Sequence, residues 1–182
     1  MDNTYVALLR GINVGGNNKI DMKALKQAFE QAGLESVKTY INSGNILFKS
    51  DHASKKELGP ITEKAIQEQF GLKIKVLIYT ADEFISIAKA LPENWLNDKE
   101  MKSDVLFLWE EVDHENVREL LHLKPEIDQV IYVPGAILWS VARENVTKSG
   151  MVKIVGTDIY RKVTIRNVNT VRKLVSLIES LE

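Results

Sequence analysis

Groups able to donate hydrogen bonds to an anion gather directly after the first apolar run of the chain. They are Arg10, Gly11, Asn13, Gly15, Gly16 and Lys19. Three glycines within six residues permit left-handed and crowded backbone conformations, which bring main-chain amides close to a ligand. The guanidinium and ammonium groups add positive charge. The stretch of residues 8–20 is therefore the best candidate for a binding site in this chain.

Two further polar segments have the composition of either a turn or a site. Their polar residues are Asn42, Ser43 and Asn45 in the first segment, and Arg166 and Asn167 in the second. Asparagines in turns commonly bond their own backbone, and Asn167 or Asn169 can cap the helix that follows. A helix N-terminus beside an arginine can also bind an anion. Both the structural and the ligand-binding role stay open for these residues.

The glycine spacing fits no named phosphate-binding motif. A Walker loop ends in Gly-Lys-Ser or Gly-Lys-Thr, and the dinucleotide fingerprint places its glycines at positions one, three and six. In this chain the three glycines fall at positions one, five and six, and no Walker ending is present. The three histidines have no partner at metal-ligand spacing, so we expect no metal site. With no nucleophile elbow and no cysteine, the sequence assigns no reaction, catalytic residue or cofactor.

The composition is that of a globular protein. The chain has 182 residues, of which 45% are hydrophobic and 27% charged, and its formal net charge is −1. No apolar run approaches the roughly 18 residues that a membrane span needs. The absence of cysteine and of a signal-like N-terminus favours a cytoplasmic location. The near-neutral charge argues against a protein that coats nucleic acid, although a local basic patch stays compatible with it.

Hydrophobic periodicity in the first half predicts strand, helix, two strands, helix, strand. The predicted segments are a strand at 5–9, a helix at 22–32, strands at 37–41 and 46–48, a helix at 54–70 and a strand at 72–78. Gly59-Pro60 either kinks the second helix or marks its start. This order is the ferredoxin-like pattern, an α+β fold in which both helices cover one face of an antiparallel sheet.

The second half repeats the order of elements without repeating the residues. Thr80 and Glu83 have the spacing of a capping box ahead of a bridging helix. The expected domains are an N-terminal half at 1–91, a polar linker at 92–103 and a C-terminal half at 104–182. In the C-terminal half we expect strands at 105–109, 130–133, 137–142 and 162–165, a helix capped by Asp113, and a closing helix from Val168. The pattern leaves open whether the halves are a topological duplication.

The ferredoxin-like order predicts that the two N-terminal polar segments meet. The loop after the first strand and the hairpin between the second and third strands open at the same end of the sheet. Because the third strand pairs with the first, Asn45 should lie near Arg10 and Gly11. The sequence therefore predicts one small polar surface built from both segments, which Arg166 and Asn167 would complete if the halves face each other.

Three motifs give the chain a family resemblance. They are Ala-Leu-Leu-Arg-Gly-Ile-Asn-Val-Gly-Gly at 7–16 followed by Lys19, Thr-Tyr-Ile-Asn-Ser-Gly-Asn at 39–45, and Thr-Ile-Arg-Asn-Val-Asn-Thr-Val at 164–171. On these motifs the chain resembles the bacterial domain-of-unknown-function family 1697. The third motif departs from the family's common form, in which an aromatic residue often stands where Val168 is. The resemblance implies a compact α+β protein with ferredoxin-like halves, and it implies no established activity, cofactor or catalytic residue.

Two functions of different class fit these observations. The first is a binding, or catalytic, site for a small anionic or phosphate-bearing ligand at the Arg10 to Lys19 loop and the Asn42 to Asn45 hairpin. The second is a non-enzymatic module whose polar edge binds a protein or nucleic acid. A concave pocket bordered by both segments would favour the first function, and an exposed edge would favour the second. The sequence does not determine the oligomeric state or whether the protein is an enzyme.

Overall fold

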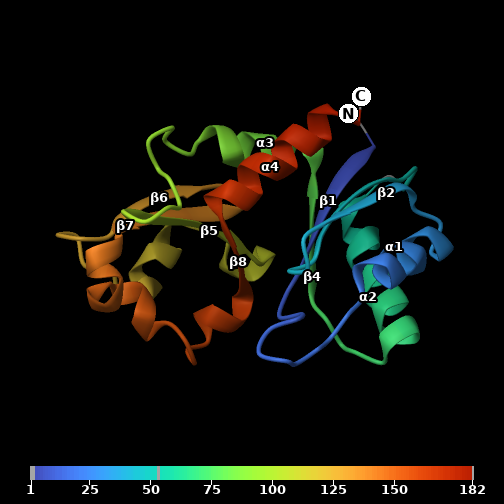
Figure 1. The fold of residues 1–182 in the computed structure, drawn as a ribbon, viewed down its shortest axis with the longest axis horizontal. Helices are drawn as coiled ribbons and strands as arrows, with labels where there is room; N and C mark the ends of the chain where they lie inside the picture. Colours follow the sequence, from blue (N-terminus) through green and yellow to red (C-terminus); the bar gives the residue numbers. More distant parts are fainter. Residues whose placement is uncertain (1–2, 53, 182) are drawn as a thin grey trace. The chain divides into compact units, whose positions relative to one another are not determined.

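The chain folds as two units, each built on a four-stranded antiparallel sheet (Figure 1). The computed structural model describes residues 3–52 and 54–181. The first unit comprises residues 1–84 and 177–182, and the second comprises residues 85–176. The division therefore falls within a helix at residue 84, ahead of the stretch at 92–103 where the sequence suggests a linker.

The first unit has the ferredoxin-like topology that its sequence predicts. Its sheet has the strand order β2-β3-β1-β4, and α1 and α2 cover the same face of that sheet (Figure 1). The elements are β1 (Thr4–Leu9), α1 (Met22–Gln31), β2 (Glu35–Tyr40), β3 (Asn45–Lys49), α2 (Lys55–Phe70) and β4 (Val76–Thr80). β3 pairs antiparallel with β1, and Asn45 lies opposite Leu8. β4 begins four residues later than the predicted strand.

Local sequence signals set the ends of the two helices. The side chain of Asp21 caps α1 by accepting a hydrogen bond from the amide of Ala24 at 2.9 Å. α2 begins after the capping residue Ser54 and ends at Gly71, which adopts the left-handed conformation (φ 67°) typical of a helix C-terminus. Pro60 lies inside α2 and not at its start.

The core of the first unit lies between the sheet and the two helices. Phe48 of β3 occupies its centre, where its ring stacks on Tyr5 at 5.6 Å and meets Phe29 edge-on at 6.0 Å. Leu25 of α1 and Ile66 of α2 are completely buried in the same cluster. Burying side chains of this size stabilises a fold by about 2 kcal/mol each.

The second unit repeats the sheet topology with different helices. Its strand order β6-β7-β5-β8 has the same connectivity as the first sheet, so the α+β fold has two similar halves. The strands are β5 (Met101–Leu108), β6 (Gln129–Val133), β7 (Ala136–Ala142) and β8 (Val163–Asn167). The α-helices are α3 (Ala81–Lys89), which begins in the first unit, and α4 (Val168–Glu179), which ends in it. The 3₁₀ helices are η1 (Glu110–Val112), η2 (Glu115–Leu121), η3 (Arg143–Lys148), η4 (Gly150–Lys153) and η5 (Ile159–Lys162).

The helix expected after Asp113 is wrong in type and in its cap. The segment forms the short 3₁₀ helices η1 and η2, and no side chain caps η2. The carboxylate of Asp113 instead accepts hydrogen bonds from the hydroxyl of Tyr132 at 2.8 Å and the amide of Gly135 at 2.9 Å. A side chain that serves the β6–β7 hairpin in this way is not available to cap a helix.

The polar stretch at 92–103 is an ordered loop that leads into β5. The guanidinium of Arg172 donates to the carbonyl oxygens of Trp95 at 2.7 Å and Pro92 at 3.0 Å. Arg143 donates to the carbonyl of Asp98 at 2.8 Å, and Trp95 is buried. These contacts tie the loop to its own unit. β5 then starts at Met101, inside the stretch that the sequence suggests is a linker.

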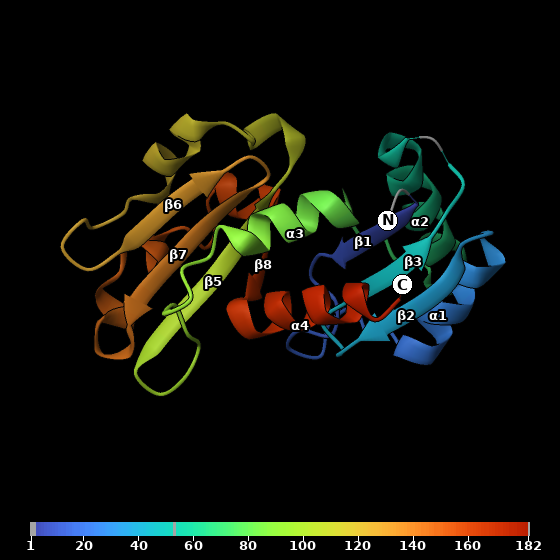
Figure 2. The same cartoon turned by 90° about the horizontal axis from the view of Figure 1, so that it is seen from above.

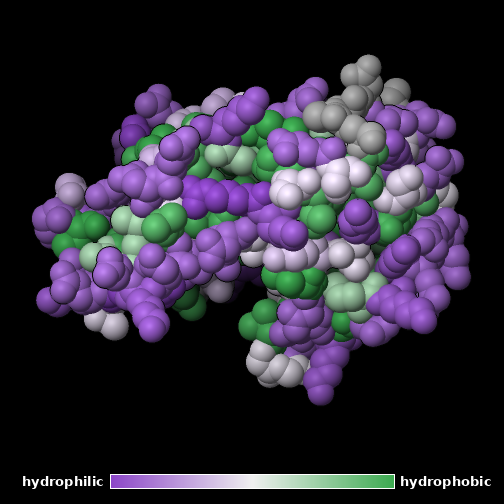
Figure 3. Space-filling model, turned by 45° about the horizontal axis from the view of Figure 1, so that its top comes forward, coloured by the Kyte–Doolittle hydropathy of each residue, from purple (hydrophilic) through white to green (hydrophobic). Residues whose placement is uncertain are grey.

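The surface on the face drawn in Figure 3 is largely hydrophilic, with apolar residues in separate patches. In the described part of the chain, no helix combines the length and hydrophobicity that crossing a bilayer requires.

Candidate functional site

The glycine-rich stretch of the first unit is a small β-hairpin. Val14 and Asn17 form an antiparallel bridge, in which the amide of Asn17 donates to the carbonyl of Val14 at 2.9 Å. Gly15 (φ 57°) and Gly16 (φ 79°) both lie in the left-handed region, as a two-residue type I′ turn requires. Turning the chain is therefore sufficient to explain why both positions are glycine.

Asn13 joins this hairpin to the turn between β2 and β3. Its side-chain amide donates to the carbonyl of Ile20 at 3.0 Å and to the carbonyl of Asn42 at 2.8 Å, and its side-chain oxygen accepts from the amide of Ile20 at 2.9 Å. Its backbone is left-handed (φ 53°), which asparagine tolerates better than most residues. The structure thus brings together the two polar segments that the ferredoxin-like order places at one end of the sheet.

The turn itself packs tightly against the end of β1. The amide of Leu9 donates to the carbonyl of Gly44 at 2.9 Å. A β-carbon added at Gly44 would lie 2.7 Å from the β-carbon of Leu9, so no larger residue fits there. The buried Asn45 donates to the carbonyl of Tyr40 at 3.0 Å and to the hydroxyl of Ser43 at 2.9 Å. Asn45 and Ser43 therefore stabilise the turn from within.

Ile41 in the same turn has an unusual backbone conformation. Its φ is 49°, a left-handed value that is an outlier for a β-branched residue, and its side chain is 47% exposed. Strain of this kind costs on the order of 1–2 kcal/mol per residue. Outliers of this kind cluster at functional sites, so Ile41 adds to the case for this turn. The sequence analysis did not select Ile41, because nothing in its local sequence indicates a left-handed backbone.

Two cationic residues lie at this edge. Arg10 directly follows β1 and is half-buried, and its amide donates to the carbonyl of Lys75 at 3.0 Å. Lys19 is exposed at the base of the hairpin, and so are Gly11 and Asn42. Asn18 donates from its side chain to the carbonyl of Gly11 at 2.9 Å. We call the set of residues 10–20 and 41–45 the β1 edge.

Comparison with known proteins places the chain in a family. The family model described as "Protein of unknown function (DUF1697)" matches residues 2–139. The chain belongs to this family. The matched range includes both motifs of the β1 edge, and the third motif at 164–171 lies beyond it. Membership of DUF1697 thus links these motifs to a family without assigning them a role.

A solved structure that is similar to this DUF1697 protein over nearly its whole length has been found. It is the conserved bacterial protein SP0830 from Streptococcus pneumoniae, with 31% identity over 96% of this chain and 97% of that chain, at a TM-score of 0.81. The small subunit of acetolactate synthase from Thermotoga maritima aligns over 92% of this chain and 93% of that chain. With 17% identity and a TM-score of 0.24, it carries no argument. No curated protein matches the chain.

Arg166 and Asn167 of the DUF1697 chain lie in the second unit. Asn167 accepts a hydrogen bond from the amide of Thr170 at 3.0 Å and so caps α4, as its position in the sequence predicts. Arg166 is buried on β8 and donates to the carbonyl of Ile165 at 3.0 Å. Burial lowers the pKa of Arg166 to about 10, which still leaves the guanidinium charged at neutral pH.

Two pockets, one in each unit, are lined by residues outside the β1 edge. One has a volume of about 240 Å³ and is lined by Gly33, Glu35, Ser50, Asp51 and His52. The other has a volume of about 330 Å³ and lies in the second unit. Neither is lined by residues of the β1 edge, and most residues of that edge are exposed. Within the ranges that the structure describes, no group of three histidine, aspartate or glutamate residues could hold a metal ion.

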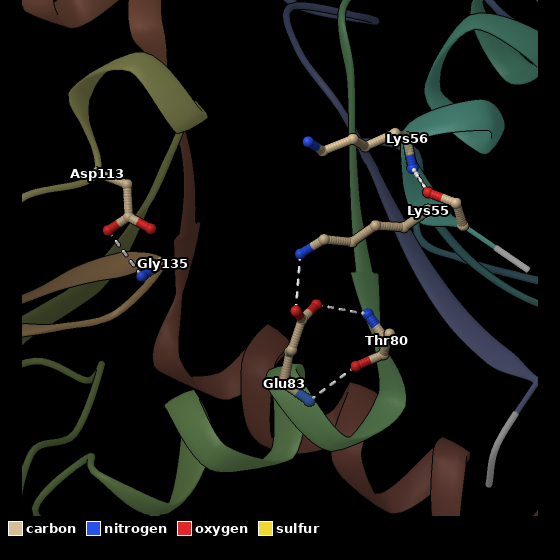
Figure 4. Close-up of polar contacts among 7 residues, drawn as sticks. Lys55, Lys56, Thr80, Glu83, Asp113 and Gly135 are labelled. Atoms are coloured by element: carbon tan, nitrogen blue, oxygen red, sulfur yellow. Dashed lines mark hydrogen bonds and ion pairs between the residues drawn. The ribbon is translucent and has the colours of Figure 1, made fainter.

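The charged cluster at the start of α3 has a structural explanation (Figure 4). Glu83 accepts from the amide of Thr80 at 2.9 Å, while its own amide donates to the hydroxyl of Thr80 at 3.1 Å. This reciprocal pair is the capping box that the sequence predicts. Lys55 reaches Glu83 from α2 at 2.7 Å. Burial would raise the pKa of Glu83, but the hydrogen bonds from Lys55 and Thr80 outweigh it and lower that pKa.

A buried carboxylate in the second unit also escaped the sequence analysis. Asp128 accepts hydrogen bonds from the indole of Trp139 at 3.0 Å and the amide of Gly150 at 3.0 Å. It also accepts from the hydroxyl of Ser149 and from the amide of Lys124 at 2.9 Å. Burial would raise the pKa of Asp128, but these four donors together lower it. Asp128 therefore fixes the loop before β6 to β7 and η4, and it has a structural role.

Proposed function

We propose that this DUF1697 protein binds an anionic, phosphate-bearing group at the β1 edge. The observation that carries the proposal is the Asn13 clamp, the three side-chain hydrogen bonds that close the hairpin between Arg10 and Lys19 and join it to the 41–45 turn. A rigid arrangement of this kind loses little conformational entropy when a ligand binds. The guanidinium group of arginine and the ammonium group of lysine commonly bind phosphate in proteins.

The predicted site residues within the β1 edge divide into two groups under this proposal. Lys19, Asn42 and the backbone of Gly11 face the ligand, because they are exposed, and the half-buried Arg10 adds positive charge beside them. The remaining members position them, because their side chains or backbone conformations are already engaged in the fold. These positioning residues are Asn13, Gly15, Gly16, Ser43 and Asn45.

A thermal-shift screen with a matched pair of variants tests the proposal. The ligands are inorganic phosphate, pyrophosphate, nucleotides, sugar phosphates and a short oligonucleotide, so that small and polymeric phosphates are distinguished. We expect one class to raise the melting temperature of the wild type, since a ligand at 100 times its Kd stabilises by about 2.7 kcal/mol. Lys19→Glu should reduce that shift, while Lys153→Glu, an equal change at an exposed lysine of the second unit, should not.

Two results would overturn the phosphate proposal. The first is that no phosphate-bearing ligand stabilises the wild type. The second is that Lys19→Glu and Lys153→Glu reduce the shift equally, because the effect would then come from overall charge and not from the β1 edge.

A second function, binding of a partner protein, is favoured by the exposure of the β1 edge, which the sequence analysis associates with this function, and by two exposed apolar residues. Val14 is 64% exposed and Ile41 is 47% exposed, and each is adjacent in sequence to one member of the hydrogen-bonded pair Asn13 and Asn42. Exposed apolar side chains within a polar surface are typical of protein interfaces. A photo-crosslinking residue at Val14 should then capture one defined partner that the same residue at Val155, which is 66% exposed in the second unit, does not. Equal capture at both positions would refute this alternative.

A further inference from the structure

The strand β6 is an edge strand with open backbone groups. It lies at the margin of the second sheet, next to β7 (Figure 2). Val133 and Ala136 close the two-residue turn between these strands, and in such a hairpin the closing pair is hydrogen-bonded. Pairs alternate along an antiparallel ladder, so the N–H and C=O groups of Val130 and Tyr132 point away from β7. They are available to an added strand.

β6 lacks the features that protect edge strands from pairing. Its sequence Gln-Val-Ile-Tyr-Val contains no charged residue and no proline, and its ladder with β7 is regular. β2, an edge strand of the first sheet, instead carries Glu35 and Lys38 and a register irregularity between them. Charges and bulges of that kind prevent an edge strand from pairing with another chain. The contrast marks β6 as an edge suited to strand addition.

The hairpin that carries β6 is held in place before any partner arrives. Asp113 binds both the hydroxyl of Tyr132 and the amide of Gly135. Burial and this hydrogen bond raise the pKa of Tyr132 to about 12, so the phenol stays protonated and keeps donating at any physiological pH. A fixed edge lowers the entropy cost of adding a strand.

The 330 Å³ pocket opens beside the first residue of β6. Its lining includes Gln129 of β6, the apolar residues Leu96 and Met101, and the acidic residues Asp98 and Glu100. Asp98 uses its carboxylate to accept from the amides of Glu100 and Met101, both at 2.9 Å, whereas Glu100 is exposed. The neighbouring cations Lys99 and Arg143 are not among the lining residues, and Arg143 donates to the carbonyl of Asp98 and to Asn97. An aliphatic stem with a cationic head, as in lysine or arginine, fits such a lining.

We propose that β6 and this pocket bind an extended segment of a partner protein that carries a lysine or arginine. The segment adds to the sheet beside β6 through the backbone groups of Val130 and Tyr132. Its basic side chain enters the pocket, where the stem packs on Leu96 and Met101 and the head group approaches Glu100. Backbone pairing supplies affinity and the pocket selects the side chain, which is the usual division in β-strand addition. This site is separate from the β1 edge and does not depend on the proposed function.

Fluorescence anisotropy with two labelled peptides tests the proposal. The first peptide alternates valine and threonine around a central lysine, and the second has glutamate in place of the lysine. We expect the lysine peptide to bind the full-length protein and the glutamate peptide to bind more weakly. Glu100→Gln should weaken binding of the lysine peptide by up to about fivefold, the effect of one exposed ion pair. Lys153→Gln is the matched control in the same unit.

A proline substitution tests the backbone contacts separately. Val130→Pro removes an N–H that points away from β7, so the β6–β7 ladder can persist while strand addition is blocked. Val130→Thr keeps the N–H and the branched shape and should bind normally. If Val130→Pro does not fold, the amide shifts of Val130 and Tyr132 in the wild type, followed by NMR during titration with the lysine peptide, give the same information.

Four outcomes would overturn the proposal. The peptides could fail to bind, or they could bind with equal affinity. The amide shifts could also map away from Val130 and Tyr132. Concentration-dependent dimerisation in analytical ultracentrifugation that Val130→Pro abolishes would assign the edge to a second copy of the chain and refute the peptide partner.

Discussion

Replacing Asn13 should separate the two contributions that this residue makes to the β1 edge. Asn13→Ala removes three hydrogen bonds, to Ile20 twice and to Asn42 once. Partly exposed hydrogen bonds contribute about 0.5–1.5 kcal/mol each. The left-handed backbone at φ 53° costs alanine roughly a further 1 kcal/mol. We therefore expect Asn13→Ala to lower the free energy of unfolding by about 3 kcal/mol.

A glycine at the same position isolates the backbone term. Asn13→Gly loses the same hydrogen bonds but adopts the left-handed conformation freely, so we expect a loss of about 2 kcal/mol. Asn17→Ala in the same hairpin is the control, because Asn17 is exposed and enters the hairpin ladder through its backbone amide. It should change stability by less than about 0.5 kcal/mol.

Urea unfolding together with amide hydrogen exchange measures these effects. Exchange at the amide of Ile20, which donates to Asn13, should accelerate in both Asn13 variants and not in Asn17→Ala. Equal unfolding free energies for Asn13→Ala and wild type would refute the clamp. Equal losses for the alanine and glycine variants would refute the contribution from the left-handed backbone.

Three further predictions concern polar groups outside the β1 edge, each measured by urea unfolding. Asp128→Asn places an amide group among four donors and should cost about 3 kcal/mol. Since the pKa of Asp128 is lowered, its contribution is lost as pH falls through the folded-state value, and this acid sensitivity should be weaker in the variant. The pKa of Asp104 shifts in the opposite direction, because burial raises it despite the nearby Lys102. The stability of the protein should therefore decline as pH rises above the ordinary pKa of a carboxyl group, and Asp104→Asn should flatten that decline. Thr80→Ala removes one half of the capping box on α3 and should cost about 1 kcal/mol.

Each of these predictions has a result that contradicts it. An Asp128→Asn protein as stable as the wild type would show that the four donors find other partners. A pH profile of Asp104→Asn that parallels the wild type would show that another group titrates. For Thr80→Ala, an unchanged unfolding free energy would mean that Glu83 caps the helix without its partner.

Local signals were sufficient to predict most of the first unit. The spacing of Leu25, Ala28 and Phe29, the cap at Asp21 and the stop at Gly71 are all short-range features, and the structure follows them. The pairing of β3 with β1 followed from the order of elements alone. Neighbouring residues therefore carried enough information to place the two polar turns at one end of the sheet.

Long-range contacts account for what the sequence could not supply. Arg172 holds the loop at 92–98 through its hydrogen bonds to the carbonyl oxygens of Trp95, 77 residues away in sequence, and Pro92, 80 residues away. The carboxylate of Asp113 accepts a hydrogen bond from the amide of Gly135, 22 residues further along the chain, so it caps no helix. The role of Asn13 was open because the sequence does not distinguish an asparagine that binds a ligand from one that joins two loops through hydrogen bonds. By contrast, Gly15-Gly16 between Val14 and Asn17 had the recognisable signature of a two-residue hairpin.

NMR titration of the isotope-labelled protein with pyrophosphate tests the central claim most directly. If the β1 edge binds phosphate groups, the amide shifts should concentrate in residues 10–20 and 41–45, and Lys19→Glu should weaken the binding while Lys153→Glu leaves it unchanged. Shifts that concentrate elsewhere in the chain, or saturable binding that Lys19→Glu does not alter, would contradict the claim.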